Sequence, residues 1–340
     1  MDAPVRDARR HDGRGALSAP PHAAAPPAAG EARAPRARGA GAIAALSASW
    51  LVVVASLLFA TMGVCVKLAA AHYGSGEIVM YRGVVGALLI LVVSRWRGET
   101  LRTAVPMRHL LRSVTGVTAL CLWFHAIAGL PLATAMTLNY TSSLWLALFL
   151  VGGAILVGSQ RVDGRLVVAA VLGFTGVVLV LRPTIEQGQL WFGLTGLLSG
   201  MVSAFGYLQI AALGRAGEPE SRIVFYFSIG GAVGGAALAA VSGWHGHTPS
   251  GVALLVAVGV LATAAQLLLT RAYARGHTLV NASLQYLGIA FSFVYGVVLF
   301  QDHVTWLAAI GMVTIVAAGV LASFVRTRQA RRDAAAQVRS

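Results

Sequence analysis

Two short polar stretches interrupt apolar surroundings in this sequence, and they carry the same residue types in the same order. The first reads TLNY at 137–140 and the second reads SLQY at 283–286. Each stretch offers a hydroxyl, an amide and a phenol, which can donate and accept hydrogen bonds and stack on a planar molecule. We therefore interpret Asn139, Tyr140, Gln285 and Tyr286 as candidate ligand-binding residues.

Other polar and aromatic side chains lie in equally apolar stretches. Polar groups are costly to place in a bilayer and usually face a helix bundle or a wet cavity, so they are natural candidates for a binding site. The same groups can instead hold helices together, because hydrogen bonds between helices are worth ~0.6 to 2 kcal/mol. The further candidates are Arg82, Trp123, His125, Tyr207, Gln266 and Asn281.

Arg82 is the most informative single candidate. Its guanidinium stays protonated in proteins, so it must find an anion, a carbonyl group or water. It could bind an acidic group of a ligand, form an ion pair with Glu77, or extend to the lipid headgroups. Lys67 could likewise form an ion pair with Glu77 or extend to the lipid headgroups. The ion pair with Glu77 would be sufficient to explain a lysine at this position.

Groups that could carry protons or bind metals are scarce. Glu77 and Asp302 are expected at the ends of apolar stretches, and no carboxylate is expected at mid-depth. His125 has the only side chain there whose ordinary pKa lies near neutrality, although it could equally be packed or interfacial. Cys65 and Cys121 show no paired spacing, so we expect no disulfide, metal or cofactor.

The elements that must position these residues are membrane-spanning helices. The 340-residue chain is 57% hydrophobic and only 11% charged, which is too apolar for a soluble globule of this size. Stretches of about 20 apolar residues fit helices that cross a ~30 Å hydrocarbon core. The expected spans are 48–70, 76–94, 109–128, 131–157, 165–182, 190–213, 221–243, 250–273, 277–300 and 303–325.

The positive residues behind the net charge of +14 indicate how the chain is oriented in the membrane. If both termini are cytoplasmic, nearly all Lys and Arg fall on cytoplasmic tails and connections, including Arg112 in the 95–112 connection, as the positive-inside rule predicts. Only Lys67, Arg82 and Arg182 would lie elsewhere. The basic balance therefore indicates an anionic lipid surface rather than nucleic acid as its partner.

The two stretches also indicate an internal repeat. Aligning 126–140 with 272–286 without a gap pairs Asn139 with Gln285 and Tyr140 with Tyr286. Two halves of five spans each must enter the membrane from opposite sides, as in many secondary transporters, where substrate binds near the midplane. At 1.5 Å per residue, each amide would lie ~12 Å from its own face.

The resulting division of the chain has four parts. Residues 1–46 are expected to form a disordered basic tail rich in Pro and Ala. The two five-helix repeats would occupy 47–184 and 185–325, and 326–340 would form a basic cytoplasmic tail. The fold class is thus an all-α membrane protein with ten transmembrane helices and both termini in the cytoplasm, as a monomer or homodimer.

The stretches LATAMTLNYTSSLW, LGFTGVVLVLRP, AQLLLTRAYARG and LVNASLQYLGIAFSFVYGVVLF resemble the EamA-type transporters of the drug/metabolite transporter superfamily. The resemblance covers about 48–325. It implies a permease or exporter of the inner membrane for amino acids, their derivatives, S-adenosylmethionine, nucleobases or riboflavin. The chain departs from the pattern at Ser142 and Ser143, where a proline is common, and at Gln160, where a glutamate is common.

Three classes of function are possible for a membrane protein with these features. The preferred one is a secondary transporter that alternates access to a midplane cavity. An ATP-driven pump is excluded within this chain, because the only lysine, Lys67, is not in a Walker loop. An intramembrane lipid-modifying enzyme would need a His, Asp or Glu cluster. A non-transporting assembly subunit would instead have its spans packed solid at mid-depth.

Overall fold

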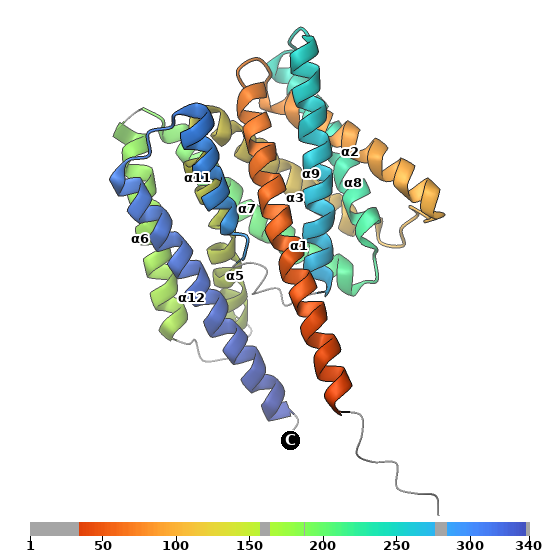
Figure 1. Cartoon of the computed structure of the whole chain (residues 1–340), viewed down its shortest axis with the longest axis vertical. Helices are drawn as coiled ribbons and strands as arrows, with labels where there is room; N and C mark the ends of the chain where they lie inside the picture. The colour runs from red at the N-terminus through yellow and green to blue at the C-terminus, as the bar shows by residue number, and fades with distance from the viewer. Residues whose placement is uncertain (1–33, 157–163, 187, 276–283, 338–340) are drawn as a thin grey trace, which may run out of the picture. The chain divides into compact units, whose positions relative to one another are not determined.

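The computed structural model describes residues 34–156, 164–186, 188–275 and 284–337. These residues form helices joined by short connections, without a strand among them (Figure 1). Residues 1–40 form a separate unit, of which only the beginning of the first helix is described. Asn281, one of the predicted site residues, lies outside the described residues.

The helices are labelled in chain order as in Figure 1. They are α1 (Ala34–Ala69), α2 (Ser75–Arg97), α3 (Pro106–Gly129), α4 (Leu132–Tyr140), α5 (Ser142–Leu156), α6 (Gly164–Glu186), α7 (Leu190–Arg215), α8 (Glu220–Ser242), α9 (Pro249–Arg275), α11 (Leu287–Phe300) and α12 (Trp306–Gln337). Helices α1 and α12 extend into the tails expected at 1–46 and 326–340.

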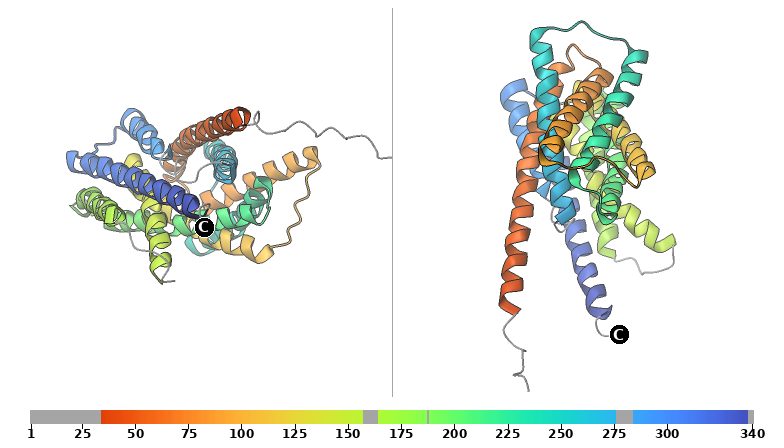
Figure 2. Two further views of the ribbon diagram at one scale, coloured as in Figure 1. Left: turned by 90° about the horizontal axis from the view of Figure 1, so that it is seen from below. Right: turned by 90° about the vertical axis from the view of Figure 1, so that its right-hand side faces the viewer.

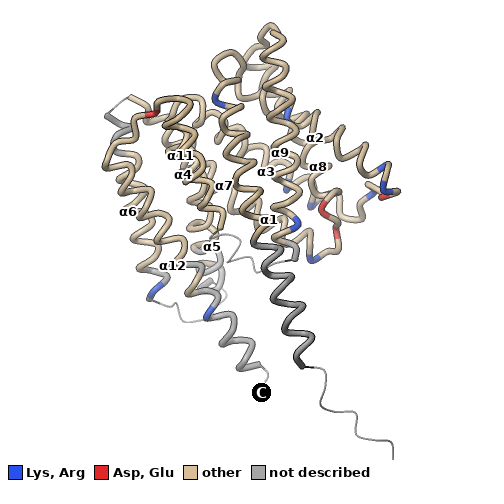
Figure 3. The backbone as a smooth tube through the Cα atoms, viewed as in Figure 1, with Lys and Arg blue, Asp and Glu red and all other residues tan. Residues whose placement is uncertain are grey.

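Several of these helices have the length and composition of membrane spans. Within the described part of the chain, six helices are long and apolar enough to cross a bilayer, and shorter apolar segments lie in α6, α11 and α12. Figure 3 shows long uncharged stretches in α6, α9, α11 and α12, with charged residues toward the helix ends. The chain is therefore an α-helical membrane protein.

The TLNY stretch ends at a turn, and the described part of the SLQY stretch also includes a turn. The span expected at 131–157 is not continuous, because α4 ends at Tyr140 and α5 begins at Ser142. In the span expected at 277–300, residues 277–283 lie outside the described part of the chain, and Gln285 and Tyr286 form a turn before α11 begins at Leu287. Broken helices free backbone groups inside a membrane protein, and they recur at the binding sites of transporters.

Helices from the two halves of the chain pack in matching pairs. Helix α2 contacts α8, α6 contacts α12, and α4 contacts α11; Figures 1 and 2 show α6 beside α12. Glycines allow close backbone approach in two of these pairs. A Cβ on Gly76 would lie 2.7 Å from the nitrogen of Ala239, and one on Gly311 would lie 2.7 Å from the oxygen of Gly176. Small residues are typical of such interfaces in membranes.

Candidate ligand-binding cavity

A cavity of about 70 Å³ lies where both halves of the chain meet. Helices α1 to α4 line it from the first half. Helices α7, α8 and α9 and the turn before α11 line it from the second half. The cavity brings together the following predicted site residues: Arg82, Trp123, Asn139, Tyr140, Tyr207, Gln266 and Gln285.

The two amides of the repeated stretches both line this cavity. The Asn139 side chain donates a hydrogen bond from Nδ2 to the Ser199 hydroxyl at 2.9 Å, which ties the end of α4 to α7. The Tyr273 hydroxyl donates to Oε1 of Gln285 at 3.4 Å. Tyr273 in turn lies parallel to Tyr207, with ring centroids 5.7 Å apart. Aromatic faces and amide groups therefore share one small space.

Two buried arginines supply the charge of the cavity. Arg82 on α2 is 4% exposed and Arg112 on α3 is 6% exposed. Their guanidinium carbons lie 5.0 Å and 4.2 Å from the centroid of the Phe227 ring, which places both over one aromatic side chain. Such cation–π contacts are worth ~0.5 to 2 kcal/mol. Neither guanidinium forms an ion pair with any residue that the structure describes.

Arg112 was not predicted as a site residue. From the sequence, Arg112 is expected among the basic residues of the 95–112 connection. In the structure, α3 begins at Pro106, so Arg112 lies on that helix within the bundle. Glycines make room for its side chain. A Cβ on Gly116 would overlap Nη1 of Arg112, and one on Gly206 would lie 3.6 Å from the same atom. The sequence feature that could have identified Arg112 as a site residue is Gly116, the glycine one helical turn after it.

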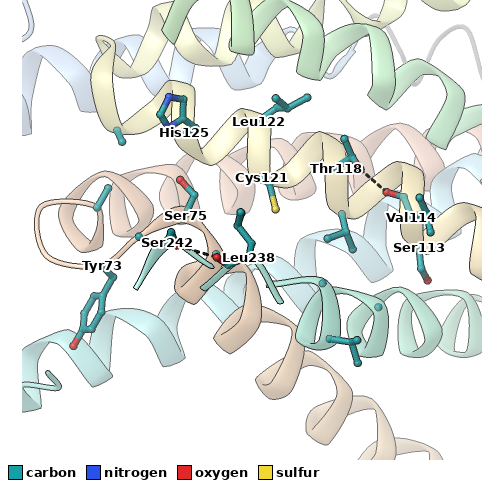
Figure 4. Close-up of a pocket in the computed structure, with 18 of the residues that line it drawn as sticks. Tyr73, Ser75, Ser113, Val114, Thr118, Cys121, Leu122, His125, Leu238 and Ser242 are labelled. Carbon is teal, nitrogen blue, oxygen red and sulfur yellow. Dashed lines mark hydrogen bonds between the residues drawn. The ribbon is translucent and has the colours of Figure 1, made fainter. Parts of the chain in front are cut away.

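Two predicted residues do not line the cavity. His125 lies in a separate, larger hollow of about 950 Å³, beside α3, α8 and the start of α2 (Figure 4). Its ring stacks on Phe192 with centroids 4.8 Å apart. Tyr286 is buried against α12, where its hydroxyl group abuts Gly319.

The acidic residues at the helix ends have partners other than the expected ones. Lys67 forms an ion pair with Asp302 at 2.9 Å rather than with Glu77. Asp302 also accepts a hydrogen bond from the backbone N–H of Leu132, at 2.9 Å. Glu77 contacts the His245 ring at 2.6 Å, so it pairs with neither Lys67 nor Arg82. Arg82 therefore does not form the ion pair with Glu77 that the sequence suggested.

A second buried carboxylate lies in the connection between α7 and α8. Glu218 accepts hydrogen bonds from the Thr103 hydroxyl at 2.9 Å and from Arg222 at 3.0 Å, and it contacts His109 at 3.2 Å. Burial by itself would raise the pKa of Glu218, but these hydrogen bonds outweigh it and hold the pKa below its usual value of 4.5. The cluster ties α3 to α8 outside the cavity.

The helical bundle and its inter-half cavity define the chain as a multi-pass membrane protein of the transporter type. Its sequence matches the profile of the EamA-like transporter family over residues 46–182. It is 31% identical over 279 residues to the pseudopaline exporter of Pseudomonas aeruginosa, which covers 80% of this chain and 94% of the exporter. The chain belongs to the EamA-like transporter family of the drug/metabolite transporter superfamily, whose members carry small molecules.

Two further comparisons agree with this assignment. The riboflavin transporter of Rhizobium johnstonii is 31% identical over 174 residues, which cover 51% of this chain and 56% of that transporter. A solved crystal structure matches with a TM-score of 0.59 and 20% identity, over 83% of this chain and 98% of that one. At that identity the structural likeness shows a shared fold alone.

Proposed function

We propose that this protein is a secondary transporter that exports a small organic metabolite across the inner membrane. It would do so by alternating access around the cavity between its two halves. In this proposal, 47–184 and 185–325 are inverted five-helix repeats, and both termini are cytoplasmic. The asymmetric placement of Lys and Arg supports that orientation. No chemical step is required, since the cavity residues bind and release the solute.

One observation carries this proposal. Polar side chains from both halves converge on one buried cavity, with Asn139 and Gln285 contributed by the two spans that contain turns. Breaks at corresponding positions of two halves indicate the binding site in transporters. An assembly subunit would have these helices packed solid. The cavity is small, but its guanidinium groups have no ion-pair partner among the described residues, and this favours a ligand-binding role over an assembly role.

The volume of the cavity supports a closed conformation. About 70 Å³ holds only a few water molecules, whereas small-molecule sites are typically ~300 to 1,000 Å³. Substrate entry would therefore require the halves to separate. The relative named as an exporter supports outward transport.

Metabolite profiling tests this function. A host that lacks the protein would be compared with the same host producing the wild type, Asn139→Ala or Gln285→Ala, at matched amounts in the membrane. We expect the wild type to deplete a compound from the cells and enrich it in the medium. We expect each amide variant to reduce that release at least tenfold, because each loses a polar contact to the solute.

Leu299→Ala is a suitable control, because Leu299 is 54% exposed on α11 and does not line the cavity. It should release the compound at the wild-type rate. Equal metabolite profiles with and without the protein would contradict the proposal. So would unchanged release in both amide variants, since the cavity would then have no part in transport.

A further inference from the structure

We infer that the substrate of this cavity is an organic anion that carries at least one carboxylate group, bound by Arg82 and Arg112. The inference rests on the proposed function and adds to it the chemical class of the substrate. Three properties of the cavity support this class: both guanidinium groups are buried, no ion-pair partner for them is found among the described residues, and apolar surfaces lie beside them.

Both guanidinium groups are held away from solvent without an anionic partner among the described residues. The side chains are 4% and 6% exposed, so neither charge can be satisfied by bulk water or lipid headgroups. Nε of Arg82 and both Nε and Nη1 of Arg112 are buried without a hydrogen-bond partner. Unpaired buried charges are strongly unfavourable in proteins and usually have a partner or a function.

The described lining of the cavity holds cationic hydrogen-bond donors and neutral amide and hydroxyl groups, but no anionic acceptor. Besides the guanidinium groups, the indole Nε1 of Trp123 is buried without a partner. Neither Asp nor Glu is among the described residues that line the cavity. A ligand that satisfies these N–H groups must therefore bring acceptor oxygens. A carboxylate matches the planar fork of Arg with two parallel hydrogen bonds.

The two positive charges converge on one place. Both guanidinium carbons lie within 5.0 Å of the Phe227 ring centroid, so one small molecule can reach both. Like charges this close repel each other, and a bound anion would remove that repulsion. The ion pairs seen elsewhere in the described chain show that the protein neutralises cations where no ligand is needed, as at Lys67 and Asp302.

Apolar groups complete the recognition surface. Phe59, Leu120, Leu269 and Phe227 line the same cavity as the arginines. They suit a carbon skeleton rather than an inorganic anion such as phosphate or sulfate. The amides of Asn139 and Gln285 can bind further polar groups of the solute. The class is therefore a carboxylate attached to a partly apolar body.

Comparison of released metabolites tests this inference. A host that lacks the protein would produce the wild type, Arg82→Gln, Arg112→Gln or the control Arg97→Gln, at matched amounts in the membrane. Arg97 is a suitable control because its side chain is 68% exposed at the end of α2. We expect the compounds released by the wild type and by Arg97→Gln to carry a carboxylate. Their release should fall at least tenfold in both cavity variants.

The outcomes separate this inference from the proposed function. Release of compounds without a carboxylate, or undiminished release by Arg82→Gln and Arg112→Gln, would overturn the anion site while transport stands. Absence of any released compound would overturn the proposed function and this inference with it. Thermal unfolding of the purified variants provides the folding control. An unfolding midpoint far below that of the wild type in both variants would assign the arginines to packing and overturn the inference.

Discussion

Replacing Arg82 with Met should abolish transport without destabilising the protein. The guanidinium carbons of Arg82 and Arg112 lie 5.0 Å and 4.2 Å from one ring centroid, so they are no more than about 9 Å apart. At an effective dielectric constant of about 20, two unit charges at that distance or closer repel by at least ~1.8 kcal/mol. The variant removes this repulsion from Arg112 and also removes the unsatisfied Nε, whose burial costs ~1 to 3 kcal/mol. It loses a cation–π contact with Phe227 that is worth ~0.5 to 2 kcal/mol. The gains are at least as large as the loss.

Thermal unfolding of the purified protein in detergent, with no added solute, measures this difference. We expect the Arg82→Met midpoint to equal or exceed that of the wild type, while release of the metabolite falls at least tenfold. A residue that lowers stability in return for function is common at binding sites. If Arg82 were instead half of a structural ion pair, its loss would cost ~3 to 5 kcal/mol.

Lys67→Met provides the comparison for that experiment. Lys67 is paired with Asp302 at 2.9 Å, and its loss leaves the carboxylate with the backbone N–H of Leu132. Hydrogen bonds to charged groups contribute ~1.5 to 3 kcal/mol, so this variant should unfold at a lower temperature than the wild type. If Arg82→Met unfolds as early as Lys67→Met, Arg82 has a structural role and the reasoning about an unpaired charge is refuted.

Three other predictions concern single residues. Gly116→Ala should reduce release strongly, because the new methyl group would overlap Arg112, whereas Gly214→Ala, with open space around it, should keep wild-type flux in the same assay. His125→Ala should also retain flux, because His125 lies outside the cavity, and a large loss would assign it a proton-carrying role. The lowered pKa of Glu218 contributes stability above pH 4.5 that is lost as the pH falls through the lower folded value, so the gap in unfolding temperature between wild type and Glu218→Gln should shrink in acid. A gap that is constant with pH would contradict that assignment.

The sequence predicted the class of fold because hydrophobic length is a local property. Apolar stretches of about 20 residues locate most helices to within a few positions of the observed ends. The break at Thr141 was not predictable in the same way. No glycine or proline lies at that point, and the break depends on a hydroxyl that bonds to the Leu138 carbonyl at 2.6 Å. Such side-chain competition with the helix is not visible in hydropathy.

The candidate site was predicted in part, for a similar reason. Polar residues in apolar surroundings identified Arg82, Asn139 and Gln285, all of which line the cavity. Arg112 was missed because it follows several other basic residues, and the hydropathy of the segment does not show where α3 begins. The pairing of Lys67 with Asp302 joins residues far apart in the chain, so only the tertiary structure could reveal it.

Uptake of the identified metabolite into inside-out membrane vesicles is the most direct measurement of the proposed mechanism. Vesicles would contain the wild type, Asn139→Ala, Gln285→Ala, or the control Leu299→Ala. The proposal predicts uptake that saturates with metabolite concentration for the wild type and the control, and uptake at least tenfold slower for the two cavity variants. Uptake that is the same in all four, or no faster than in vesicles without the protein, would contradict transport through this cavity.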